Sequence, residues 1–77
     1  MKRRRRLHGP PPAAARRGPQ EWTKRERALY ELVFAASFAA EYAAAKAGGA
    51  MYPGDLAAMR ALNAGLEAVD QRQQGNG

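Results

Sequence analysis

Several kinds of stabilising and reactive residue are missing from this 77-residue chain. It has no cysteine, and its only histidine, His8, lies in a segment of arginine and proline. Disulfides and thiolate metal sites are therefore excluded, although small domains commonly depend on them. The absence of cysteine fits a reducing compartment, so we expect a cytoplasmic protein.

Long apolar segments are also missing. The longest uncharged apolar run, residues 32–40, has nine residues, whereas a membrane-spanning helix needs about 20. The basic start, residues 1–6, leads into Leu7-His8-Gly9-Pro10 and not into the apolar stretch of a secretory signal. We expect neither a membrane span nor secretion.

The groups that carry out catalysis are scarce. Residues 20–77 contain one threonine, one serine, no cysteine and no histidine, so a Ser–His or Cys–His pair cannot be assembled there. Glu67 and Asp70 share a helix face, but a solvated acidic edge explains them, and no Glu-x-x-His or phosphate-binding glycine motif accompanies them. We predict a protein that is not an enzyme and uses no cofactor, metal ion or small-molecule substrate.

What the chain does have is a segregated charge. Residues 1–19 hold seven bases and no acid (+7), and residues 20–77 hold six bases and seven acids (−1), which gives the net +6. Because the first segment is polar and rich in proline, we expect residues 1–19 to form a disordered arm. Its bases are Lys2, Arg3, Arg4, Arg5, Arg6, Arg16 and Arg17.

The arm supports more than one interpretation. Arginine makes paired contacts with phosphate, so these bases predict contact with a polyanion such as nucleic acid, and the same charges suit anionic lipid. The arm has no aromatic residue, which does not favour stacking on single-stranded bases. A solubilising tail or a misassigned start codon explains the same composition without a binding role.

Residues 20–74 predict an all-α fold, an antiparallel hairpin of two helices. Thr23 and Glu26 have the spacing of a capping box, so the first helix is expected over about 24–47. The glycine pair that follows it, at 48 and 49, supplies a left-handed stop.

A loop over 48–54 is expected to precede the second helix, over about 55–73, with Asp55 at its start. Residues 75–77 are expected to fray. The second helix carries a narrow apolar seam with the spacing of a coiled-coil contact, made of Leu56, Met59, Leu62, Leu66 and Val69.

The first helix carries two apolar stripes. One becomes small toward its end, which predicts a close seat for the second helix; it consists of Leu29, Val33, Ala36, Ala40, Ala43 and Ala47. The other is aromatic and spaced by four, and consists of Tyr30, Phe34, Phe38 and Tyr42. One helix cannot cover both. The aromatic stripe is either ordinary core, covered by the second helix and the loop, or an interface; large exposed aromatic patches are uncommon on monomers, so we favour an interface.

A hairpin of this size buries little apolar area, and association into a helical bundle is the remaining route to stability. We therefore predict a non-enzymatic interaction module that self-associates or docks on a larger protein through the aromatic stripe. The alternative is a nucleic-acid-binding protein, with the hairpin as dimerisation unit and the arm as contact. A peripheral membrane protein is a lesser alternative, because Glu31 and Glu41 do not suit the basic polar face of such helices.

Overall fold

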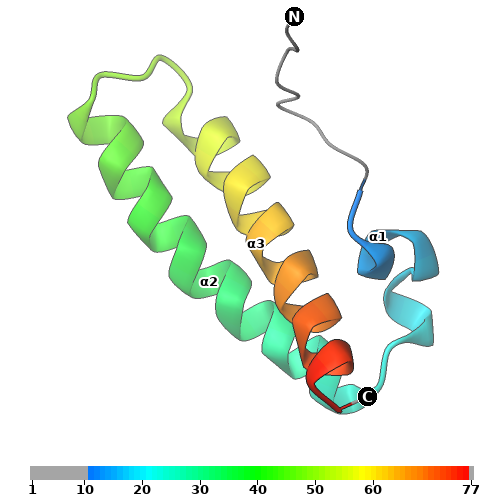
Figure 1. Ribbon diagram of the computed structural model, residues 1–77. Coiled ribbons are helices and arrows are strands. Elements are labelled where there is room, and N and C mark those ends of the chain that lie inside the picture. The colour runs from blue at the N-terminus through cyan, green and yellow to red at the C-terminus, as the bar shows by residue number, and fades with distance from the viewer. Residues whose placement is uncertain (1–10, 77) are drawn as a thin grey trace, which may run out of the picture.

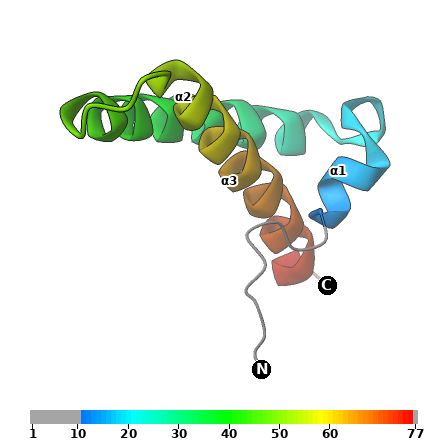
Figure 2. The ribbon, with the colours of Figure 1, turned by 90° about the horizontal axis from the view of Figure 1, so that it is seen from above.

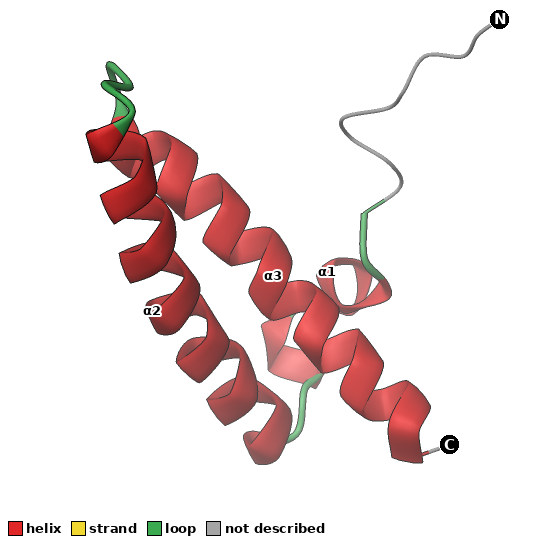
Figure 3. Ribbon diagram, turned by 60° about the vertical axis from the view of Figure 1, so that its left-hand side comes forward, coloured by secondary structure: helices red, strands yellow, loops and turns green. Residues whose placement is uncertain are grey.

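The computed structural model describes residues 11–76, which form a hairpin of two long helices preceded by a short helical segment (Figures 1 and 3). The described residues contain no strand. The long helices run antiparallel and pack against each other, so the expected all-α hairpin is confirmed. In chain order the elements are α1 (Ala13–Arg17), the 3-10 helix η1 (Pro19–Glu21), α2 (Lys24–Ala47) and α3 (Pro53–Asn76).

Helix α2 begins and ends at the expected residues. The Thr23 hydroxyl accepts a hydrogen bond from the Glu26 backbone N–H at 3.0 Å, and the Glu26 carboxylate accepts one from the Thr23 N–H at 2.9 Å. This capping box satisfies two backbone donors that the first turn leaves free. At the other end, Gly49 adopts φ 79°, and the Ala50 N–H donates to the Ala45 carbonyl at 2.9 Å. A left-handed glycine and a six-residue closing bond are the Schellman stop.

Helix α3 is longer than expected at both ends. It begins at Pro53, two residues before Asp55, because the fixed φ of proline suits a first turn and its missing N–H costs nothing there. The Asp55 and Leu56 N–H groups both donate to the Tyr52 carbonyl, at 3.1 and 3.2 Å. The helix reaches Asn76, so two of the three residues expected to fray belong to it, and Gly77 lies outside the described residues.

The segment before α2 differs from the expected disordered arm of residues 1–19. Residues 1–10 lie outside the described part, but α1 and η1 are ordered and return to α3 (Figure 1). Ala14 is fully buried, its N–H donates to the Asp70 carboxylate at 2.7 Å, and its carbonyl accepts from the Trp22 indole N–H at 3.3 Å. The prolines and arginines of this segment predict disorder, but its composition does not show that Asp70 and Trp22 will bond to it. These hydrogen bonds offset the entropy that is lost when the segment is ordered.

The face that α3 turns toward α2 is made of small residues. Ala57 and Ala61 are fully buried, Gly65 is buried, and Val69 continues the same four-residue spacing with no exposure. The expected seam is therefore wrong over most of its length. Met59 is 58% exposed and Leu62 46% exposed, and of the seam only Val69 is buried, with Leu66 partly so.

The face that α2 presents to α3 also differs from the expected one. The alanines at 36, 40, 43 and 47 are all exposed, whereas Tyr30, Phe34 and Phe38 are partly buried. Large rings on one helix need small residues on the other, and α3 supplies them. The two helices cross obliquely when seen from above (Figure 2). The alanines of the first stripe are therefore uncovered, although Leu29 and Val33 of that stripe are partly buried, and the aromatic stripe lies along the edge of the α2–α3 contact.

Candidate interaction surface

The aromatic stripe predicted from the sequence is extended by one ring in the structure. Successive centroids from Trp22 to Tyr42 lie 5.2, 5.9, 6.2 and 5.8 Å apart, within the range of favourable ring pairs. Phe34 and Phe38 are nearly parallel, at 5°. We call this set the aromatic row; its members are Trp22, Tyr30, Phe34, Phe38 and Tyr42.

Exposure increases along the aromatic row. Trp22 is buried, the next three rings are partly buried, and Tyr42 is 38% exposed. The Tyr30 ring lies against Gly65, where an added Cβ would come within 2.5 Å of its Cδ1 atom. Burial also raises the pKa of the Tyr30 hydroxyl above its ordinary value of 10.0. Trp22 and Tyr30, at the start of the row, thus belong to the core. The prediction that the row is an interface now concerns Phe34, Phe38 and Tyr42.

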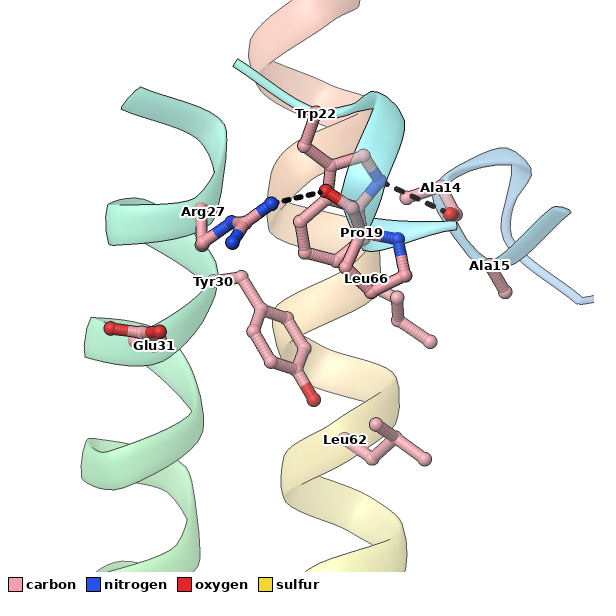
Figure 4. Close-up of a pocket in the computed structure, with 9 residues that line it drawn as sticks. All are labelled: Ala14, Ala15, Pro19, Trp22, Arg27, Tyr30, Glu31, Leu62 and Leu66. Carbon is pink, nitrogen blue, oxygen red and sulfur yellow. Dashed lines mark hydrogen bonds between the residues drawn. The ribbon is translucent and has the colours of Figure 1, made fainter. Parts of the chain in front are cut away.

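A pocket of about 390 Å³ opens at the buried end of the row (Figure 4). Its walls are formed by α1, η1, α2, α3 and the connection between η1 and α2, and they are mainly apolar. The Arg27 guanidinium stands at its edge, donating to the Pro19 carbonyl at 2.8 Å, and Glu31 lies one turn further along α2. The lining residues are Ala14, Ala15, Pro19, Trp22, Arg27, Tyr30, Glu31, Leu62 and Leu66. Sequence reasoning missed this pocket because α1 and η1 form one of its walls.

Large apolar side chains are exposed at the opposite end of the hairpin. In the connection between α2 and α3, Met51 is 80% exposed and Tyr52 65% exposed. The loop therefore does not fold back over the helix ends, and it does not help α3 to cover the aromatic stripe, as one of the two interpretations of that stripe expected. The hairpin therefore has an open apolar pocket at one end and protruding apolar side chains at the other.

Glu26 is a buried carboxylate at the base of the hairpin. Besides the Thr23 N–H, it accepts a short hydrogen bond from the Gln73 side chain of α3, and Arg17 lies 3.7 Å away. The hydrogen bond from the Thr23 backbone lowers the pKa of Glu26 below its ordinary value of 4.5, with smaller lowering contributions from Gln73 and Arg17 and an opposing one from burial. Glu26 thus ties α2 to α3 and to the α1 segment.

The bases predicted to contact a polyanion fall into three groups. Lys2, Arg3, Arg4, Arg5 and Arg6 lie outside the described residues. Arg16 is exposed, although one of its N–H groups donates to the Pro11 carbonyl at 3.0 Å. Arg17 is only partly exposed and is paired with Glu26. Of the two arm bases that the structure describes, Arg16 is therefore the one available to a polyanion.

Among the residues that the structure describes, no group of three His, Cys, Asp or Glu residues is placed to hold a metal ion. None of their helices combines the length and apolar character that crossing a bilayer requires. The chain matches no protein-family model, no curated protein and no solved structure with which it was compared.

Proposed function

We propose that this chain is a non-enzymatic interaction module, a helical hairpin that self-associates or docks on a larger protein. The contact is made through Phe34, Phe38 and Tyr42, which we call the open part of the aromatic row. The observation that supports this most is the smallness of the interior. Five apolar residues are buried in the described part of the chain, and three of them are alanine: Ala14, Trp22, Ala57, Ala61 and Val69.

So small an interior does not suit an isolated monomer. The apolar area buried on folding must offset the entropy of ordering more than sixty residues, and chains of this length often need a partner to do so. Val69 is the largest side chain that is fully buried. The large rings and leucines of the hairpin therefore stabilise it further when a second surface covers them.

The open part of the aromatic row is continuous with apolar side chains of α3. Leu62 and Leu66 are four residues apart on one face of α3, and both line the pocket with Tyr30, so they lie on the row's side of the hairpin. Leu62 is nearly half exposed. Together the row and these leucines form an apolar face that spans both helices, as the interfaces of helical bundles do.

Light scattering after size exclusion tests this function. We expect the wild type to have a mass above that of one chain, and Phe34→Asp and Phe38→Asp to return it to one chain, because a carboxylate cannot be buried without a partner. Tyr42→Asp makes the same change at a more exposed ring, so it disturbs the packing of α2 on α3 least. Circular dichroism verifies helix content in every variant.

Ala40→Asp is the control, because Ala40 is exposed on α2 two residues from both Phe38 and Tyr42 and hence on another face. It is expected to leave the mass unchanged. A stably folded wild-type monomer, or assembly that survives all three row variants, would contradict the proposal.

The segregated charge favours a second candidate function, contact between the basic arm and a nucleic acid. Since Arg17 pairs with Glu26, the contact depends on the bases at 2–6 and on Arg16. Binding to duplex DNA or RNA should weaken with salt and fall sharply when residues 1–10, which carry five of these six bases, are deleted, while Arg17→Ala should have little effect. Binding that survives the deletion would remove the arm from the mechanism.

A further inference from the structure

We propose that the partner at the open face of the aromatic row is a second copy of this chain, packed antiparallel about a two-fold axis near Phe38. This inference rests on the proposed function and names its partner. Two features of the face support it: the complementary shapes of its two ends and the complementary charges beside them.

The shapes of the two ends match each other. The pocket lies beside Tyr30 near the start of α2, and the protruding Met51 and Tyr52 follow the end of α2. An antiparallel second copy brings its loop to the pocket of the first, and the two-fold axis repeats the contact at the other end. Both pockets then receive apolar side chains, and the four most exposed large side chains of the two loops leave water.

The charges beside the row also match. Glu31 stands at the pocket and Lys46 near the loop; both are exposed, and neither forms an ion pair within the described part of the chain. They are fifteen residues apart, close to four helical turns, so they project from a similar side of α2 at a separation of about 22 Å.

These positions set the register of the two copies. Pairing Glu31 of one copy with Lys46 of the other places the midpoint between residues 38 and 39, so the two Phe38 rings lie beside the axis. In the same register the residue opposite Tyr30 is Ala47, immediately before the loop that carries Met51 and Tyr52. The charge pairing and the fit of loop to pocket therefore require one and the same arrangement.

A parallel arrangement lacks both forms of complementarity. It places Glu31 beside Glu31 and Lys46 beside Lys46, which costs free energy, and it sets pocket against pocket and loop against loop. In the antiparallel pair the two-fold axis makes the same contacts twice, and each copy uses the whole of its contact surface. A third copy then has no free surface to bind, so we infer a dimer of hairpins with four long helices.

A charge exchange tests the pairing. Glu31→Lys and Lys46→Glu each turn two attractive contacts of the dimer into two repulsive ones, and each should raise the dimer dissociation constant by about tenfold, given the modest energy of exposed pairs. The double variant restores both attractions and should return the constant to within about threefold of wild type. Sedimentation equilibrium at low ionic strength measures all four proteins, and their helix content is compared by circular dichroism.

Arg60→Glu is the control for Lys46→Glu, since it makes the same change in net charge. Arg60 lies about 200° around α3 from Leu62, on another side of the hairpin, where it pairs with Glu41 at 3.5 Å. It should leave the dimer dissociation constant unchanged. Because the chain has no cysteine, a mixture of Glu31→Cys and Lys46→Cys proteins adds a direct readout, a disulfide-linked heterodimer formed faster than with Asn63→Cys in place of Lys46→Cys.

Two results would overturn the inference in distinguishable ways. If the wild type dimerises and Tyr42→Asp dissociates it, but the charge exchange gives no loss and rescue, the antiparallel pairing is wrong while the interaction function stands. If the wild type is a stably folded monomer at all concentrations, the second copy is not the partner, and the proposed function fails with it.

Discussion

Replacement of Gly65 by alanine tests the contact that holds the two long helices together. Gly65 is buried in the middle of α3, and an added Cβ would lie 2.5 and 2.7 Å from the Cδ1 and Cε1 atoms of Tyr30 and 3.2 Å from its carbonyl oxygen. The first two distances are below any normal carbon contact. The ring can turn away, but the carbonyl belongs to the backbone of α2, so relief of the third contact requires the helices to separate.

The expected magnitude is the difference of two opposing effects. Overpacking of a well-fitted contact costs about 1–3 kcal/mol, whereas exchange of glycine for alanine inside a helix gains about 1 kcal/mol. Gly65→Ala should therefore lower the free energy of unfolding by up to about 2 kcal/mol. Gly54→Ala is the matched control: Gly54 is in the first turn of α3, and nothing lies within 4 Å of its added Cβ. That variant should be neutral or more stable than wild type.

Urea denaturation followed by circular dichroism, at one fixed protein concentration, measures both variants. The free energy of unfolding should be lower for Gly65→Ala than for Gly54→Ala by about 1–3 kcal/mol. Tyr30→Ala should remove only part of this difference, because it takes away the ring that the new methyl group meets but leaves the Tyr30 carbonyl in place. If Gly65→Ala stabilises the protein as much as Gly54→Ala does, the packing of Tyr30 on α3 is wrong.

Two further predictions concern the base of the hairpin. Because the folded state lowers the pKa of Glu26, the stability that this carboxylate contributes is complete above its ordinary value of 4.5 and is lost as the pH falls through the folded value. As the pH is lowered from about 6 to 3, the urea midpoint of the wild type should therefore decrease more steeply than that of Glu26→Gln. Equal slopes for the two proteins would contradict this account. Asp70→Ala removes the acceptor of the Ala14 N–H, so α1 should detach and the fluorescence of the buried Trp22 should shift to longer wavelength, while Asp70→Asn, which keeps an oxygen acceptor, should shift it less; an unchanged spectrum in Asp70→Ala would mean that this bond does not hold α1.

The helices themselves were predictable because their signals are local. The capping box of Thr23 and Glu26 and the stop at Gly49 depend on residues within a few positions, and the bounds of α2 were correct. The sequence predicts the start of α3 two residues late, because Asp55 is a good N-cap residue, whereas in the structure Pro53 already fits the first turn.

The relative placement of the helices was not predictable from periodicity alone. Spacing identifies an apolar stripe, but it does not say whether a large stripe faces another large one or a small one. Here Tyr30 packs on Gly65, so Leu62 stays partly in water and the alanines of α2 at 36, 40, 43 and 47 are left uncovered. The ordered α1 and the pocket depend on contacts between residues more than fifty positions apart, such as Ala14 with Asp70, which no local signal encodes.

The central claim is that the interior of one hairpin is too small to stand alone and that association supplies the rest. Thermal unfolding followed by circular dichroism over about a hundredfold range of protein concentration tests it most directly, since the stability of an associated fold depends on protomer concentration. We expect the midpoint temperature of the wild type to rise with concentration, and that of Tyr42→Asp to be lower and independent of concentration. A cooperative wild-type transition with one midpoint at every dilution would contradict the account.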